Sequence, residues 1–144
     1  MIKQDLDKII TFDISKSLNL EGDTAPYIQY GYARAARILE KAKSEPNFDA
    51  NYALLDNDFE KNLVKIIGLF DIQIKDAANN FSPKVIAKYC YDLAVGFNGF
   101  YEHVRILDSD NNELINVRLC LVKSFMNVLK IALDLLRIST PSRM

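Results

Sequence analysis

The sequence has few of the side chains that most often build catalytic and metal sites: it contains two cysteines and one histidine among 144 residues. Both cysteines, Cys90 and Cys120, stand inside apolar helical patterns, so we expect reduced thiols in a core, and neither a disulfide nor a metal pair. His103 stands alone beside Glu102, and we expect a surface or capping role for it. No G-x-S-x-G, phosphate-binding loop or Cys/His metal spacing is present, and no predicted apolar pocket pairs two carboxylates. The chain by itself is therefore not expected to be an enzyme.

Long apolar runs are also absent. None approaches the roughly 20 residues that a membrane-spanning helix needs, and no secretory leader precedes the first charged residues. We therefore expect a cytoplasmic protein without a membrane partner. The composition, 49% apolar and 26% charged, is typical of a globular protein. Its 144 residues suit one domain with its own core, so we predict a single domain over residues 1–144.

The chain lacks an overall excess of positive charge, because its net charge is −1. This argues against a generally basic nucleic-acid binder, and we expect no DNA partner. The charge is unevenly distributed, however. Residues 24–44 carry four basic residues against one acidic, and residues 111–144 carry five against two, so each segment is +3 while the rest is acidic. A polyanion would find two candidate strips if the fold brings them together.

Period-two alternation is short wherever it occurs, whereas period 3.6 recurs throughout, which predicts an all-α protein. Proline and polar breaks divide the pattern into about five helices. Their expected ranges are 2–19 (with a break near 11–13), 24–44, 58–79, 83–104 and 113–137. Thr24 and Ser82 are the expected N-caps of the second and fourth helices. Short connections favour antiparallel neighbours, so we predict a compact bundle.

The predicted second helix contains the stretch TAPYIQYGYARAARILEKA (Thr24–Ala42). At about 100° per residue, one side of it borders the core face and is both aromatic and basic. The residues on that side are Tyr27, Tyr30, Arg34, Arg37 and Lys41. Tyrosine rings suit stacking on unpaired RNA bases, and guanidinium groups suit forked bonds to phosphate. Helix geometry equally allows an ordinary core edge, in which the arginines meet acidic neighbours such as Glu40.

Three segments carry recognisable motifs. The first is FDISKSLNLEGDTAPYIQYGYARAARIL (Phe12–Leu39), the second PKVIAKYCYDLAVGFNGFYEHVRIL (Pro83–Leu107), and the third VRLCLVKSFMNVLKIALDLLRISTPSRM (Val117–Met144). In order, they resemble three parts of the C-terminal anticodon-binding domain of arginyl-tRNA synthetases. These are its opening F-D-x-x-x-x-L-x-x-x-G-D-T-G-P-Y-L-Q-Y-A-H-A-R, its L-A-x-x-F-N-x-F-Y stretch and its L-L-G-I-x-x-P-E-R-M ending. The resemblance covers essentially the whole chain.

The resemblance implies a class I synthetase that joins arginine to its tRNA using ATP, with this helical domain (often called DALR) at the C-terminus. The parent's catalytic domain has no counterpart in the sequence. The chain therefore looks like the excised C-terminal domain, with Met1 an added start and no cofactor of its own. The expected partners are the anticodon stem-loop of arginine tRNA and the catalytic domain of the parent.

The same resemblance assigns candidate roles to individual residues. Tyr27, Tyr30 and Arg34 would contact the anticodon stem-loop. Tyr101 and Met144 would line the pocket for splayed anticodon bases, of which the middle C is the one worth reading because all arginine codons share a middle G. Arg37 and Lys41 are added from their charge alone. The candidate tRNA-binding set is therefore Tyr27, Tyr30, Arg34, Arg37, Lys41, Tyr101 and Met144.

Several positions depart from the family pattern. Ala25 replaces a frequent glycine, Tyr32 stands where histidine is common, Arg137 occupies the position of the L-L-G glycine, and Ser142 that of the P-E-R-M glutamate. These departures leave the predicted fold intact and make the path of the C-terminal tail less defined.

Other interpretations stay open. Lys123, Lys130 and Arg137 recur every seven residues on the last predicted helix, which is more typical of a solvated face than of a second RNA-binding row. The same bundle could be a stand-alone RNA-binding or protein-interaction module, or a structural domain. It could also belong to a related synthetase such as the cysteine enzyme, although Q-Y-x-x-A-R and the terminal R-M favour arginine.

Overall fold

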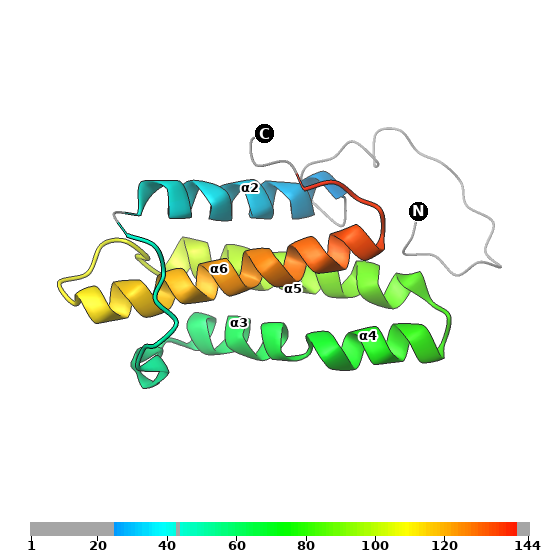
Figure 1. Cartoon of the computed structure of the whole chain (residues 1–144), viewed down its shortest axis with the longest axis horizontal. Coiled ribbons are helices and arrows are strands. Elements are labelled where there is room, and N and C mark those ends of the chain that lie inside the picture. The colour runs from blue at the N-terminus through cyan, green and yellow to red at the C-terminus, as the bar shows by residue number, and fades with distance from the viewer. Residues whose placement is uncertain (1–24, 43, 141–144) are drawn as a thin grey trace.

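The structure, a computed structural model, describes residues 25–42 and 44–140, and these form helices and connecting segments without a strand. Figure 1 shows the α-helices α2 (Ala25–Lys41), α3 (Asp58–Gly68), α4 (Phe70–Asn79), α5 (Pro83–His103) and α6 (Asn112–Leu135). A short 3-10 helix, η1 (Tyr52–Leu54), precedes α3. The predicted all-α bundle is confirmed. The helix expected over residues 2–19 and the Thr24 cap lie outside the described residues.

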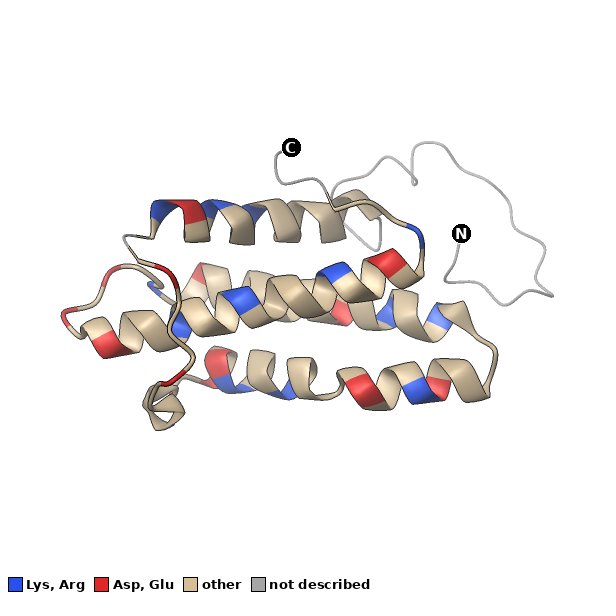
Figure 2. Ribbon diagram, in the orientation of Figure 1, with Lys and Arg blue, Asp and Glu red and all other residues tan. Residues whose placement is uncertain are grey.

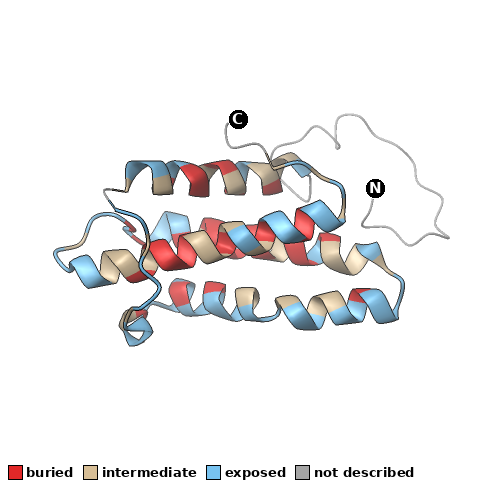
Figure 3. Cartoon of the chain, viewed as in Figure 1, coloured by how far each residue is buried: buried red, intermediate tan, exposed pale blue. Residues whose placement is uncertain are grey.

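Helices α5 and α6 form the centre of the bundle. Helix α2 packs against both of them, and α3 and α4 pack against the opposite side of α5. Figure 3 shows the buried residues on the faces that these helices turn toward one another. At the centre, the rings of Phe97 and Phe125 stack with centroids 4.0 Å apart, which joins α5 to α6. Helices α2 and α5 run in the same direction, so their C-terminal ends lie at one end of the bundle (Figure 1).

One predicted helix is wrong: residues 58–79 form two helices, separated at Leu69. The backbone of Leu69 has φ −79° and ψ −5°, which ends α3 and begins α4. Gly68 immediately precedes it, and glycine has the lowest helix propensity after proline. The apolar stripe continues in phase through the break, and for this reason the hydrophobic pattern alone does not reveal it.

A buried ion pair ties three parts of the chain together at the end of the bundle where α3 begins. Glu60 is 1% exposed. One of its carboxylate oxygens accepts from the backbone N–H of Asn57 at 3.0 Å, completing a capping box. The other accepts from Nε of Arg118 on α6 at 2.6 Å. Nη1 of Arg118 also donates to the carbonyl oxygen of Arg105 at 3.0 Å. The start of α3, the second turn of α6 and the segment after α5 therefore share one polar cluster.

Helix α6 ends earlier than predicted, in a Schellman motif. The N–H of Ile138 donates to the carbonyl of Leu133 at 3.0 Å, and the N–H of Arg137 donates to that of Asp134 at 3.0 Å. Arg137 has φ 59°, so it lies beyond the helix and does not continue the row of Lys123 and Lys130. Arginine thus occupies a left-handed position for which glycine is the usual residue, and the family pattern has a glycine there.

We expect Arg137→Gly to raise the free energy of unfolding by about 0.5–1 kcal/mol, because glycine adopts positive φ without the steric cost that Cβ imposes. Lys130→Gly is the matched control: it also removes one positive charge from an exposed site, but inside α6 it should cost about 1 kcal/mol. Urea unfolding of both variants measures the difference. A loss of stability in both variants would contradict the expectation.

Candidate functional site

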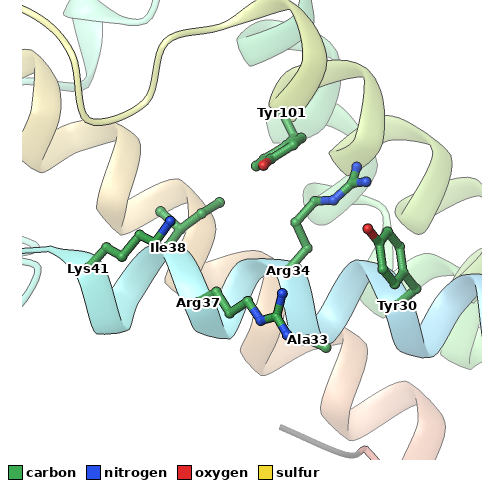
Figure 4. A pocket seen from close by; sticks show the side chains of 7 residues that line it. All are labelled: Tyr30, Ala33, Arg34, Arg37, Ile38, Lys41 and Tyr101. Atoms are coloured by element: carbon green, nitrogen blue, oxygen red, sulfur yellow. The ribbon is translucent and has the colours of Figure 1, made fainter. Parts of the chain in front are cut away.

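The guanidinium group of Arg34 lies between two tyrosine rings that come from different helices (Figure 4). Tyr30 stands one turn earlier on α2, and Tyr101 stands in the last turn of α5. The Cζ atom of Arg34 is 4.7 Å from the ring centroid of Tyr30 and 4.3 Å from that of Tyr101. Both distances are within the range of a cation–π contact. Because both tyrosines remain partly exposed, at 46% and 41%, this stack of planar groups faces solvent.

Besides the two rings, the buried side-chain amide of Asn98 contacts the guanidinium of Arg34. Nη1 of Arg34 donates to Oδ1 of Asn98 at 3.1 Å. Asn98 is 7% exposed and lies on α5, three residues before Tyr101, so the two side chains project from neighbouring positions on one face. One turn of α5 thus supplies both the acceptor and one ring that hold Arg34.

The stack forms one wall of a basic cavity, which we call the α2–α5 slot. Its volume is about 170 Å³. The residues that line it are Tyr30, Ala33, Arg34, Arg37, Ile38, Lys41 and Tyr101. Three of them are cationic and none is acidic, and Figure 2 shows the basic residues of α2 gathered toward its C-terminal half. The slot therefore combines positive charge with exposed aromatic rings.

A wider hollow adjoins the slot where α5 ends. It shares Ile38, Lys41 and Tyr101 with the slot and continues along residues 102–107. Tyr101, like Ile38 and Lys41, therefore lines both cavities. A flexible ligand that occupies the slot and the hollow would contact its ring.

The charges of the slot act on the phenol of Tyr30. A hydrogen bond from Arg34 lowers the pKa of Tyr30, and the positive charges of Arg34 and Arg37 lower it further. The cause is that these groups favour the phenolate over the neutral phenol. The hydroxyl of Tyr30 is consequently a better hydrogen-bond donor than that of an isolated tyrosine.

The slot brings together most of the residues that the sequence nominated. Tyr30, Arg34, Arg37 and Lys41 all line it, as the helical count predicted, and Tyr101 joins them from α5. Arg34 bonds to Asn98 and contacts the two rings, so the alternative in which it pairs with an acidic neighbour does not describe its contacts.

One nominated residue lies elsewhere, and another falls outside the described part of the chain. Tyr27 is half-buried and its ring packs against Tyr91, with centroids 5.8 Å apart, so it seals the edge of the core and does not line the slot. Met144 lies outside the described residues. The chain is described as far as Thr140, and the carbonyl oxygen of Ser139 accepts from Nε2 of Gln29 at 2.8 Å. The segment after α6 therefore returns to α2 next to Tyr30.

Asn98 is the residue that sequence reasoning missed. It falls in the F-N-x-F-Y stretch, next to the buried Phe97 and two residues before the buried Phe100, and a polar side chain among core residues was the available signal. His103, by contrast, is exposed as predicted. Its ring stacks on Phe59 with centroids 4.1 Å apart, and its Nδ1 lies 2.9 Å from the carbonyl oxygen of Gly99.

Neither a metal site nor a disulfide is found among the described residues. They contain no group of three or more His, Cys, Asp or Glu side chains that could hold a metal ion. Cys90 and Cys120 are both free and buried, and burial raises the pKa of the Cys90 thiol to about 12, as expected of core cysteines. Over residues 25–42 and 44–140, no helix has the length and apolar character needed to cross a membrane.

Comparisons with known proteins point in one direction. The family described as the DALR anticodon binding domain matches residues 28–144. Arginine–tRNA ligase of Lactococcus lactis subsp. cremoris (strain MG1363) is 40% identical over 144 residues, which are 99% of this chain and 25% of that protein. The enzyme of Lactobacillus johnsonii is 41% identical over 143 residues, with the same coverage. The chain thus spans about a quarter of the length of the curated relatives it matches.

Solved structures of arginyl-tRNA synthetases contain a domain with the fold of this chain. Thermus thermophilus arginyl-tRNA synthetase superposes with a TM-score of 0.87 and 34% identity, covering 99% of this chain and 25% of that one. The arginyl-tRNA synthetase of Plasmodium falciparum gives a TM-score of 0.83 at 29% identity, with the same coverage.

Proposed function

The chain belongs to the family of DALR anticodon-binding domains, and from this premise we propose that it binds the anticodon arm of arginine tRNA as the C-terminal domain of an arginyl-tRNA synthetase. In this proposal the α2–α5 slot receives unpaired nucleotides of the anticodon loop. The observation that carries it is the Arg34 guanidinium between two exposed tyrosine rings on a wall without acidic residues.

The chemistry of the slot suits single-stranded RNA. Bases stack on aromatic rings whatever their identity, and this contact is worth about 1–3 kcal/mol per base. Arg34, Arg37 and Lys41 supply cationic donors for the phosphates between such bases, and guanidinium groups bind phosphate with forked geometry. The wider hollow beyond Tyr101 offers room for a neighbouring base.

Within the parent enzyme, we propose that this domain holds the tRNA while arginine is joined to it elsewhere. ATP and arginine would bind to the catalytic domain of that enzyme, and we assign no cofactor to the bundle itself. The single-domain organisation of residues 1–144 is part of the same proposal, as is a cytoplasmic location without a membrane or DNA partner. Met144 and Tyr27 remain proposed tRNA contacts, the former as part of the base pocket and the latter at the edge of the site.

Titration of the 144-residue chain with the anticodon stem-loop of arginine tRNA tests this function. We expect weak, salt-sensitive binding, because few phosphates are neutralised. A stem-loop whose middle anticodon C is replaced by another base should bind about tenfold less tightly, since one wrong base costs about 1–3 kcal/mol. Fluorescence anisotropy of labelled RNA at several salt concentrations gives both quantities. Equal affinity for the two stem-loops would contradict anticodon reading, and no binding to either would contradict the function itself.

A further inference from the structure

We propose that Asn98 is a positioning residue of this site: its buried amide holds the Arg34 guanidinium between Tyr30 and Tyr101, so that the cationic stack is formed before RNA arrives. The inference rests on the proposed function, since it concerns how the α2–α5 slot is prepared for a nucleotide. It adds a residue to which neither the helical pattern nor the family motifs gave a role.

The side-chain amide of Asn98 is buried. Among the described residues, Glu60 and Asn98 are the buried polar or charged side chains, and the carboxylate of Glu60 is occupied by Asn57 and Arg118. Burying an amide costs free energy unless it is hydrogen-bonded. The bond that Asn98 accepts comes from Arg34, which is 64 residues away in sequence and on another helix. The buried amide of Asn98 on α5 is thus directed at the side chain of Arg34 on α2.

The contacts of Arg34 hold its side chain in one conformation. An arginine side chain loses about 2 kcal/mol of rotamer entropy when it is fixed in one conformation. The two rings confine the guanidinium of Arg34 between them, and the bond to Oδ1 of Asn98 fixes its rotation within that plane. A cation held in advance spares RNA the cost of ordering it, and such preorganisation increases affinity without adding a contact.

The bond also determines which donors of Arg34 remain for a ligand. One donor of Nη1 is directed inward to Asn98. The guanidinium has four further N–H donors; one bonds to Tyr30, and the others are the candidates for contact with a phosphate. Without Asn98, the group could turn its whole fork to solvent, and the rings of Tyr30 and Tyr101 would lose the cation between them.

A double-mutant cycle separates positioning from a merely structural role. Affinity for the arginine anticodon stem-loop is measured for the wild type, Asn98→Ala, Arg34→Ala and the double variant. We expect Asn98→Ala to weaken binding about fivefold to tenfold, and to have no further effect once Arg34 is absent, because residues in one network are not additive. Equal weakening in both backgrounds, or no weakening in either, would overturn the inference.

The titration of Tyr30 supplies a readout that needs no RNA. Because Arg34 lowers the pKa of Tyr30, releasing Arg34 should raise that pKa. Ultraviolet absorbance of tyrosinate against pH, with Tyr30→Phe as the reference for the other tyrosines, isolates the Tyr30 step. Asn98→Ala and Arg34→Ala should both move it upward. An unmoved Tyr30 step in Asn98→Ala would overturn the inference even if RNA binding falls.

Asn98→Asp keeps the shape and the acceptor, and it guards against a variant that fails to fold. It should retain the position of Arg34 but neutralise its charge, so the slope of log affinity against log salt should become shallower by about 0.7, the contribution of one single-stranded phosphate. An unchanged slope would overturn the inference.

If Arg34→Ala leaves RNA affinity unchanged, the proposed site fails. If Arg34→Ala weakens binding and Asn98→Ala does not, only the positioning role fails.

Discussion

Replacing Glu60 with alanine is expected to lower the free energy of unfolding by about 3–5 kcal/mol, the usual cost of leaving a buried charge without its partner. The side chain of Arg118 is 14% exposed, and in this variant it keeps its bond to the carbonyl of Arg105 but loses the carboxylate. The N–H of Asn57 loses its acceptor at the start of α3 as well. Urea denaturation with circular dichroism measures the change.

An exposed ion pair of similar length provides the control for Glu60→Ala. Asp56 and Lys61 are 2.6 Å apart, but the side chain of Asp56 is 92% exposed. Asp56→Ala should therefore cost far less than Glu60→Ala, because solvent screens an exposed ion pair. Glu60→Gln should fall between the two, because the amide oxygen can still accept one bond while the charge is lost. A Glu60→Ala variant as stable as Asp56→Ala would show that the buried pair contributes little.

The polar cluster around Glu60 also bears on the site. Arg118 bonds to the carbonyl of Arg105, and Arg105 lines the hollow beside Tyr101. The segment that leaves α5 is therefore held to α6 at the point where it forms one wall of that hollow. Loss of Glu60 would loosen this wall as well as the start of α3, so RNA binding should be measured on Glu60 variants only at temperatures well below their unfolding midpoints.

Much of the fold follows from the sequence because the helices obey simple local rules. Pro83 at the first turn and the polar residues before α6 place both starts within one residue of the predicted positions. The break at Leu69 depends on one backbone torsion inside an uninterrupted apolar stripe, which no periodicity registers. The end of α6 was misplaced for a related reason, because Arg137 was counted in the helical row although it adopts positive φ.

Some residues of the site were likewise predictable from the sequence, and others were not. Tyr30, Arg34, Arg37 and Lys41 lie on one helix, so their spacing alone predicts a shared face. The family motif was needed to nominate Tyr101, because nothing in its local sequence indicates contact with α2. Asn98 was missed since its role depends on a bond between helices that only the packing of α2 on α5 creates. Tyr27 had the correct spacing, but its ring packs against Tyr91 of α5 instead of lining the slot.

Tyr101→Ala is expected to reduce affinity for the arginine anticodon stem-loop by about tenfold to a hundredfold, within the range of about 1–3 kcal/mol that one stacked base contributes. Two effects combine in this change. The variant removes a ring that lines both the slot and the hollow, and it removes one of the two rings that contact Arg34. Helical content should change little, because Tyr101 is 41% exposed and stands in the last turn of α5.

Two further variants make the result specific to the ring of Tyr101. Tyr101→Phe keeps the aromatic face and should retain most of the affinity. Tyr52→Ala removes a similarly exposed tyrosine, 46% exposed, that does not line the slot. The Tyr52 variant should bind RNA as the wild type does. RNA titration and far-ultraviolet circular dichroism of the three variants complete the test. If Tyr101→Ala binds as tightly as Tyr52→Ala, then Tyr101 is not part of the RNA site, and the stack around Arg34 would have to be explained by the packing of α2 on α5 alone.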